Sequence, residues 1–207
     1  MKVFGNVYSD IGERTVNEDA VLYSVVRIRK KKLVVAIVCD GIGGLSEGDL
    51  AAGYICRRLN EAIYSRIIPA LLNRRSMRFI EKRLKDVLYS ISKELREYAD
   101  KKKIRLGSTL SCLLLFGRRY LILNVGDSRV YMIKDKKAPG MMTVSDINPD
   151  GSICRCIGSF PFYEPFSVRG YVFLRTGFLV CSDGFYKRMD KEISILCPSG
   201  ITDECSI

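Results

Sequence analysis

The chain has 207 residues, of which 47% are hydrophobic and 28% are charged, with a formal net charge of +11 and no histidine. This length and composition predict one globular domain over residues 1–207, and no apolar run approaches membrane-spanning length or forms a signal peptide, so we expect a cytoplasmic protein that binds no membrane. Because there is no histidine, imidazole catalysis and imidazole metal ligation are excluded, which leaves carboxylates, hydroxyls, thiols, Lys, Arg or a metal.

The first part of the chain predicts two strands joined by an acidic loop. Apolar and polar residues alternate over 2–9 and 20–29. The loop between them carries Arg14 and the adjacent carboxylates Glu18 and Asp19. Such neighbours repel one another unless they are hydrogen-bonded or share a cation, although a solvated loop is the simpler interpretation.

A short apolar run, Val34 to Asp40, predicts a buried strand that follows a hairpin turn at Lys30–Lys32. The run ends at the carboxylate of Asp40 and continues into a corner with glycines at 41, 43 and 44. Glycine lets the backbone turn tightly and approach a partner of the charge. An ordinary Asp-Gly turn is an equally good interpretation of this stretch alone.

Two amphipathic helices are predicted next. Apolar residues recur at helical spacing over 46–68, a pattern that Pro69 and then Asn73-Arg74-Arg75 break, and again over 76–103. Two long helices in succession predict an antiparallel pair that covers one sheet.

The remainder predicts strands, with residues 138–160 unassigned. One of these strands runs into Asp183-Gly184, which repeats the arrangement at Asp40, and a helix over 184–196 follows. We expect the chain to end on a last short strand near Asp203. The expected strands of this region are 108–116, 119–125, 128–134, 165–174 and 177–182.

Several carboxylates therefore lie at strand ends or turns that are far apart in the sequence. If they converge, so much negative charge is tolerable only around hard cations, and oxygen ligands suit Mg²⁺ or Mn²⁺. Two such ions can supply a nucleophilic hydroxide and clamp a phosphoryl group. The carboxylates are Glu18, Asp19, Asp40, Asp127, Asp183 and Asp203.

Six short motifs in order give the chain a resemblance to the metal-dependent serine/threonine protein phosphatases of type 2C, particularly their short bacterial members. The resemblance runs from residue 3 to residue 207. The motifs are Arg14-x-x-x-Glu18-Asp19, Asp40-Gly41-x-Gly43-Gly44, Gly107-Ser108-Thr109, Asn124-x-Gly126-Asp127-Ser128-Arg129, Cys181-Ser182-Asp183-Gly184 and Asp203.

The resemblance implies an α+β fold: a four-layer α-β-β-α sandwich of two antiparallel sheets flanked by helix pairs, with metals at one edge. It also implies two Mn²⁺ or Mg²⁺ ions and a hydroxide between them that attacks phosphorus in line, without a phospho-enzyme. The implied roles are Asp40 bridging both ions, the Gly41 carbonyl on one ion, Asp183 and Asp203 on the other, Glu18 and Asp19 holding metal-bound waters, and Arg14 gripping the substrate phosphate.

The implied partners are phosphorylated serine/threonine proteins, with a cognate protein kinase among them, and we expect a monomer. The charge of +11 also permits nucleic-acid binding, which predicts salt-sensitive retention on nucleic acid. Because the basic residues fall in short runs on expected helix surfaces without interleaved aromatic residues, we favour a solvated surface that attracts acidic or phosphorylated partners and binds no nucleic acid.

The chain departs from the family pattern at three places. Lys187 stands where relatives often have an aspartate that supports a third metal with the aspartate at position 127, so we expect that third site to be weak or absent. The region after Thr143 lacks a usual histidine, and the flap that follows is shortened, which should open the cleft. Ile42 replaces a proposed general acid. These departures leave a catalytically silent phosphatase fold, used as a binding module, as the alternative to an active enzyme.

Overall fold

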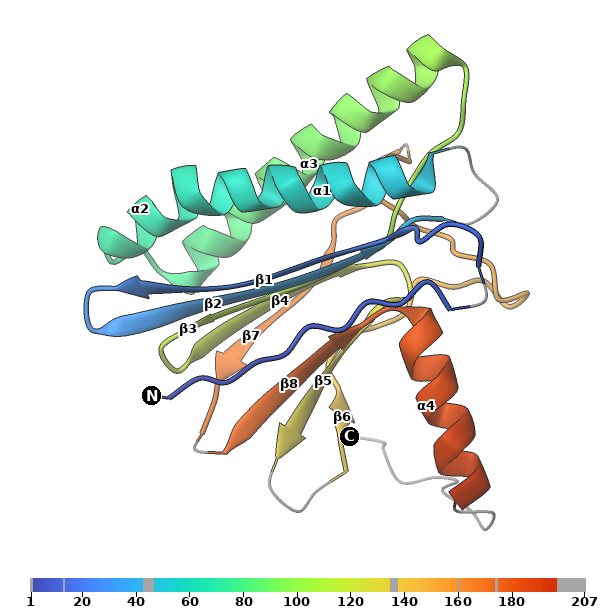
Figure 1. Ribbon diagram of the computed structural model, residues 1–207. Helices are drawn as coiled ribbons and strands as arrows, with labels where there is room; N and C mark the ends of the chain where they lie inside the picture. The colour runs from blue at the N-terminus through green and yellow to red at the C-terminus, as the bar shows by residue number, and fades with distance from the viewer. Residues whose placement is uncertain are drawn as a thin grey trace.

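A computed structural model describes residues 2–12, 14–42, 47–134, 138–159, 161–173 and 175–196, with residues 190–196 described by their backbone alone. In this part of the chain two antiparallel sheets pack face to face, and helices lie on both outer sides (Figure 1). The α+β sandwich predicted from the sequence is confirmed.

The larger sheet has the strand order β1-β2-β3-β4-β7. Its first two strands form a hairpin in which Asp19 lies opposite Asp40 and Ile28 opposite Lys31. Each of the next two strands also pairs with its predecessor in antiparallel register. The bounds are β1 Asp19–Ile28, β2 Lys31–Asp40, β3 Leu110–Phe116, β4 Arg119–Val125 and β7 Phe166–Tyr171.

The smaller sheet has the order β6-β5-β8, with β5 (Arg129–Lys134) between β6 (Gly140–Met141) and β8 (Thr176–Cys181). Both pairings are antiparallel. The region 138–160, left unassigned from the sequence, contains little extended structure among its described residues. It holds strand β6 and two isolated bridges, one between Ile147 and Ile153 and one between Ile157 and Ser108.

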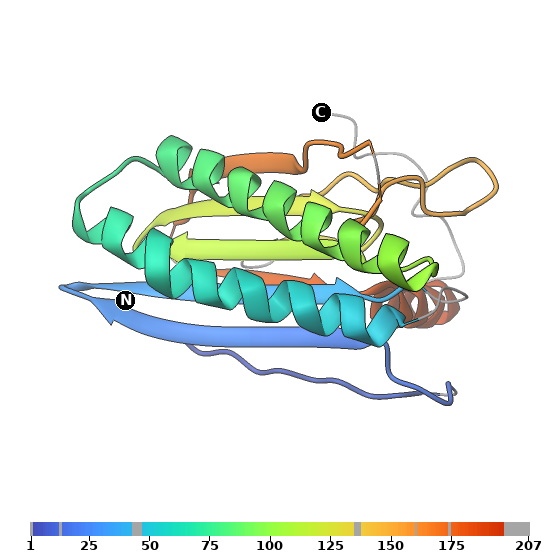
Figure 2. The same cartoon turned by 90° about the horizontal axis from the view of Figure 1, so that it is seen from above.

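A helix pair covers the outer face of the larger sheet, as predicted (Figure 2). The first helix begins as α1 (Gly48–Ala62), passes through a π-helical turn η1 (Ile63–Ile67) and ends as α2 (Ile68–Leu72). The second is α3 (Met77–Lys102), whose first turn is capped by the hydroxyl of Ser76, which accepts a hydrogen bond from the Phe79 amide at 3.2 Å.

Of the two predicted breaks in the first helix, Pro69 does not end it, whereas the break at Asn73 is confirmed. Pro69 lies in the first turn of α2, where its missing amide proton is tolerated because the preceding π-helical turn has already broken the regular hydrogen-bond ladder. The helix therefore continues to Leu72.

Three apolar layers hold the sandwich together. Alternate residues of the larger sheet, among them Leu33 and Leu114, pack against the helix pair, where Leu59 and Leu88 are fully buried. Residues of the opposite parity, such as Ile122, pack against the smaller sheet. The alternation of buried side chains along each strand assigns one face to each layer.

The outer face of the smaller sheet is covered by α4 (Asp183–Leu196). Tyr186 and Met189 of this helix pack on Tyr131, Leu179 and Cys181. A helix pair was expected on this side, and within the described residues α4 stands there alone. The last strand expected near Asp203 lies outside the described residues.

The strand predicted at residues 2–9 was wrong. This segment has no strand pairing in the structure and runs past β1, where Gly5 lies against the Tyr23 ring (Figure 1). Phe4, Val7 and Tyr8 are 89%, 54% and 69% exposed, so the alternating apolar residues have no buried face to occupy. No helix in the described ranges is both long and apolar enough to span a bilayer.

Candidate functional site

Four of the predicted carboxylates lie at the same end of the sandwich. Asp19 begins β1 and lies opposite Asp40, which ends β2. Asp127 follows the end of β4, and Asp183 follows the end of β8 and begins α4. Asp40 and Asp127 are only 8% and 7% exposed. The strand ends therefore bring together acidic residues that are more than 160 positions apart in the chain, as Asp19 and Asp183 are.

The backbone of Asp40 is hydrogen-bonded to Ser108 and Thr109, the two residues that lead into β3. Its amide donates to the Thr109 hydroxyl at 3.1 Å, and its carbonyl accepts from the Thr109 amide at 2.9 Å and from the Ser108 hydroxyl at 3.0 Å. The Thr109 hydroxyl is itself 2.7 Å from that of Ser128. With its backbone satisfied in this way, the carboxylate of Asp40 is left to face the site.

The acidic side chains of the site have too few positive groups nearby, among the described residues, to neutralise them. Burial, together with the neighbouring charges of Asp19 and Asp183, raises the pKa of Asp40 to about 8. Burial also raises the pKa of Asp19, and burial with the charge of Asp183 raises the pKa of Asp127. Shifts of this kind favour binding of a cation, which would let these carboxylates ionise.

Lys187 places a positive charge in direct contact with the site. Its Nζ lies 2.6 Å from Oδ2 of Asp183, one helical turn earlier in α4. Burial opposes ionisation of Asp183, but the hydrogen bond and charge of Lys187 outweigh it and lower the pKa of that carboxyl. The same hydrogen bond raises the pKa of Lys187. One of the predicted metal ligands is therefore already paired with an ammonium group.

Asp127 has one partner and one free oxygen. Its Oδ2 accepts a hydrogen bond from the Tyr186 hydroxyl at 3.3 Å, and its buried Oδ1 has no hydrogen-bond partner. The guanidinium of Arg129 lies over the ring of Tyr186, 3.5 Å from its centre. An unpaired buried carboxylate oxygen is costly, and it fits a place where a cation or its water would bind.

Arg14 and Glu18 form an ion pair on the exposed side of the site. Arg14 Nη1 lies 3.3 Å from Glu18 Oε2, and the Arg14 side chain is 56% exposed. Arg14 also lies within electrostatic reach of Asp19 and Asp183. Its guanidinium is therefore at the rim of the acidic cluster, where its free donors face solvent.

Gly41 explains why the corner after Asp40 needs glycine. Its amide donates to the Glu18 carbonyl at 3.0 Å, and a Cβ added at Gly41 would lie 2.5 Å from the backbone of Gly48. Only glycine lets the strand end, the acidic loop and the start of α1 approach so closely. Gly43 and Gly44 lie outside the described residues.

Two residues of the site were not singled out from the sequence. The Ser182 hydroxyl donates to Asp19 Oδ2 at 2.8 Å and so ties the start of β1 to the residue that follows β8. Tyr186 holds Asp127. Ser182 stands inside the Cys181-Ser182-Asp183-Gly184 motif, which could have pointed to it, whereas nothing in the sequence marks Tyr186 apart from its place one turn after Asp183.

The residues present fit a hard divalent cation by their chemistry. Their ligand atoms are all oxygens, and burial with the neighbouring negative charges raises the pKa values of Asp19, Asp40 and Asp127. Among the described residues no three aspartate, glutamate or cysteine side chains converge closely enough to hold one ion by themselves. Asp203, predicted to be a further ligand, lies outside the described residues, and Asp183 is engaged by Lys187.

Comparison with known proteins gives a consistent family match. The family model described as protein phosphatase 2C matches residues 8–197. The serine/threonine phosphatase stp of Listeria innocua is 32% identical over 108 residues, which are 51% of this chain and 41% of that protein. The chain thus spans less than half the length of the curated relatives it matches.

Solved structures share the fold. Serine/threonine phosphatase Stp1 from Staphylococcus aureus superposes with a TM-score of 0.74 at 23% identity, covering 94% of this chain and 82% of that one. The catalytic domain of the serine/threonine protein phosphatase PstP, in complex with two manganese ions, superposes with a TM-score of 0.69 at 19% identity, covering 88% of this chain and 78% of that one.

Proposed function

Because the chain belongs to the protein phosphatase 2C family, we propose that it is a metal-dependent serine/threonine protein phosphatase. The observation that carries this proposal is the gathering of Asp19, Asp40, Asp127 and Asp183 at one end of the sandwich, where the pKa of Asp40 rises to about 8. Divalent cations would neutralise such a cluster of carboxylates, and ions held in this way can promote hydrolysis of a phosphate ester.

We propose that two Mn²⁺ or Mg²⁺ ions bind here and that Asp40, the Gly41 carbonyl, Asp183 and Asp203 would hold them. The two manganese ions of the PstP structure support this choice of cofactor. When bound, such ions supply a hydroxide nucleophile near neutral pH and neutralise the phosphoryl oxygens, so that the ester is hydrolysed in line without a phospho-enzyme.

The remaining residues of the site orient the ions and the substrate. Glu18 and Asp19 would act through water, and the hydrogen bond from Ser182 fixes which Asp19 oxygen faces the cluster. Arg14 would bind the substrate phosphate with the donors that its pair with Glu18 leaves free. Because Ile42 offers no proton, water must protonate the leaving group.

Lys187 lies where it would disfavour the third metal ion that relatives bind. Its ammonium is bound to Asp183 and lies within electrostatic reach of Asp127. We propose that it takes the place of a cation beside Asp127 and that a third ion binds weakly or not at all. The substrates would be phosphoserine and phosphothreonine proteins of the cytoplasm, a cognate protein kinase among them, and the enzyme would act as a monomer without nucleic acid or membrane.

The test is hydrolysis of p-nitrophenyl phosphate and of a phosphothreonine peptide with increasing Mn²⁺. We expect metal-dependent release of phosphate and a loss of at least about a hundredfold in Asp40→Asn, because the substitution removes a negative charge and one of the two carboxylate oxygens that would hold the ions. Asp86→Asn is the matched control, since Asp86 is exposed on α3 and lies outside the acidic cluster.

Equal inactivity of the wild-type protein and Asp40→Asn, with Mn²⁺ binding to the wild type demonstrated by calorimetry, would favour the silent binding module instead. The departures at Lys187 and in the shortened flap are the observations that support that second candidate.

A further inference from the structure

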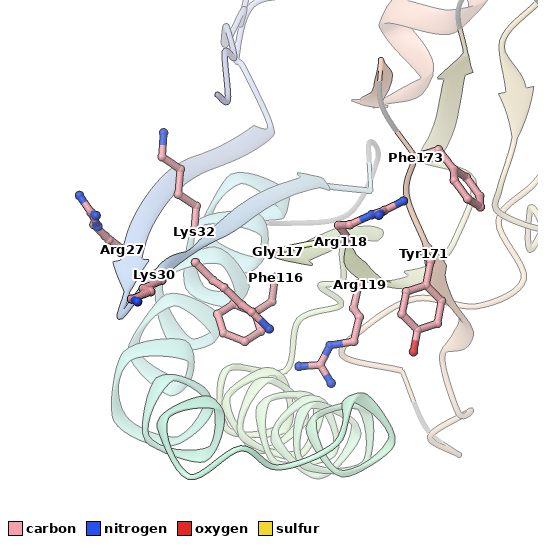
Figure 3. A pocket seen from close by; sticks show the side chains of 10 residues that line it. Arg27, Lys30, Lys32, Phe116, Gly117, Arg118, Arg119, Tyr171 and Phe173 are labelled. Atoms are coloured by element: carbon pink, nitrogen blue, oxygen red, sulfur yellow. The ribbon is translucent and has the colours of Figure 1, made fainter. Parts of the chain in front are cut away.

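A basic pocket lies at the other end of the larger sheet from the acidic cluster. Its volume is about 950 Å³. The walls come from the β1–β2 turn, the β3–β4 turn and the segment that ends β7, three stretches that are far apart in the sequence (Figure 3). Strand β2 connects the two sites, since Lys31 begins it at the pocket and Asp40 ends it at the cluster. At the rise of an extended strand this separates them by roughly 30 Å.

The pocket concentrates positive charge without compensating acid. Within the described residues, none of its cationic side chains forms an ion pair with a carboxylate, and no aspartate or glutamate lines the pocket. Like charges held this close repel one another, so an anion that enters is favoured by all of them. The cationic residues are Arg27, Lys30, Lys31, Lys32, Arg118 and Arg119.

Several of these cations are held in place by their neighbours. Arg118 Nε donates to the Val172 carbonyl at 3.1 Å, and its guanidinium lies 5.6 Å from the centre of the Phe173 ring. Lys31 and Arg119 lie 5.5 and 5.7 Å from the centre of Phe116. A cation already ordered on an aromatic ring loses less side-chain entropy when a ligand binds.

The pocket also offers exposed aromatic surface beside these charges. Tyr171 and Phe173 are 67% and 70% exposed, whereas Phe116 is buried. In Figure 3, Arg119 and Tyr171 extend from one side of the sheet end, and Phe173 lies on the other, beyond Arg118. No single stretch of the sequence interleaves basic and aromatic residues. The fold instead brings basic and aromatic residues together from three separate stretches.

We propose that this pocket docks an acidic, phosphorylated peptide segment of a partner protein, at a site separate from the metal edge. Guanidinium groups bind phosphate and carboxylate oxygens in a bidentate manner, and the exposed rings can pack on the side chains between them. The idea deepens the proposed function, because the partner would be a phosphoprotein substrate. An extended chain of about nine residues would bridge the pocket and the acidic cluster.

The shape of the charged surface favours a peptide over nucleic acid. The six cations crowd around one sheet end and do not form a track along the molecule, whereas a nucleic-acid groove follows a backbone over many phosphates. A pocket of this volume matches a short segment of chain, whose few charges and side chains it can enclose.

The test measures binding directly and needs no catalysis. A fluorescein-labelled twelve-residue peptide with two phosphothreonines and four glutamates is titrated with the full chain in EDTA, and anisotropy is recorded. Lys32→Gln/Arg118→Gln should weaken binding about tenfold. Lys101→Gln/Lys102→Gln removes the same charge at the end of α3 and should bind as the wild type does. Circular dichroism checks that both variants are folded.

Equal binding by the wild type and the pocket variant overturns the proposal, as does equal weakening in both variants, which would indicate net charge alone. A single-stranded DNA dodecamer is the competing probe. If the DNA binds more tightly than the peptide and the pocket variant loses this DNA binding, the pocket is a nucleic-acid site and the peptide assignment is overturned. Because the binding assay contains no metal, it does not depend on phosphatase activity. If the peptide binds to the pocket but the protein hydrolyses no phosphoester with Mn²⁺, the docking proposal stands and the proposed phosphatase function is wrong.

Discussion

The ammonium of Lys187 competes with metal ions for Asp183. The two are 2.6 Å apart, and the Lys187 side chain is 62% exposed, so solvent weakens the pair. We predict that Lys187→Ala binds Mn²⁺ about two- to fivefold more tightly in isothermal calorimetry, because an exposed ion pair no longer has to be broken. Arg188→Ala removes the same charge at the next position and should leave the affinity unchanged. Weaker binding in Lys187→Ala would mean that the lysine supports the site.

Gly126 shows how a residue outside the acidic cluster can control Asp40. Its φ is +92°, and an added Cβ would lie 2.7 Å from Thr109 Cγ2, on the side chain that holds the Asp40 amide. We predict that Gly126→Ala loses about 2–4 kcal/mol of unfolding free energy in urea, through backbone strain and overpacking. Mn²⁺ affinity should fall with it. Gly53→Ala, where an added Cβ meets nothing within 4 Å, is the control that should not be destabilised.

Single residues differ in how far the sequence predicts them. Asp40, Asp127 and Asp183 follow apolar runs, and their common location could be inferred from strand ends and from the family resemblance. The ion pair between Lys187 and Asp183 was not predicted in that form, although the four-residue spacing on a helix permits it. Tyr186 became recognisable only when α4 was placed beside Asp127, because that contact joins residues 59 positions apart.

At the level of helices, one ion-paired network joins α1 to α3. Glu94 of α3 accepts hydrogen bonds from Arg58 at 2.9 and 3.2 Å and from the Tyr54 hydroxyl at 2.6 Å. The network is partly exposed, so we predict that Glu94→Gln loses about 0.5–1 kcal/mol of unfolding free energy at pH 7. Glu97→Gln, whose pair with Lys93 spans 3.8 Å at the surface, should lose nothing measurable.

The same pair predicts a pH dependence with a definite sign. The hydrogen bonds from Arg58 lower the pKa of Glu94, with burial opposing them. A carboxyl whose folded pKa is depressed contributes stability that is present above its unfolded pKa, about 4.3, and is lost as pH falls through the folded pKa. The difference in urea midpoint between wild type and Glu94→Gln should therefore shrink from pH 7 to pH 3. A difference that grows on acidification would contradict this assignment.

Helices and strands with a buried face could be predicted from the sequence, whereas the structure of the exposed segment 2–9 could not. The period of apolar residues gave α3 and the strands β1, β3, β4, β5 and β8 within one or two residues, because burial enforces that period. Strand β2 begins three residues before the predicted run, β7 ends three residues before its predicted end, and β6 lies in the region left unassigned. Residues 2–9 carry the same alternation but lie exposed beside β1, so local pattern could not report the absence of a partner. The π-helical turn that carries the first helix past Pro69 has no sequence signature that we could use.

For the molecule as a whole, metal binding and folding stability are linked. A ligand that binds only the folded state at a hundred times its dissociation constant adds about 2.7 kcal/mol per site. For a chain of this size we predict that saturating Mn²⁺ raises the melting temperature by about 5–10 °C. Asp40→Asn should abolish most of this rise, and Asp86→Asn should retain it. An equal rise in both variants would place the ions elsewhere.

The sandwich architecture followed from the resemblance more than from the residues alone. Which sheet carries which strand depends on long-range pairing, such as β4 with β7 and β5 with β8, and alternation does not specify partners. The basic pocket was hidden for the same reason, since Lys31, Phe116 and Tyr171 meet only after the larger sheet has formed.

The placement of acid at one end of the larger sheet and base at the other makes the molecule an electric dipole superimposed on its net charge of +11. A negatively charged protein that approaches by diffusion would feel a torque on this dipole and meet the basic pole before the acidic one. Counter-ions at physiological strength shorten the range of that orienting field to about 8 Å. Encounters at low salt would therefore begin from a narrower set of mutual orientations than encounters in the cell.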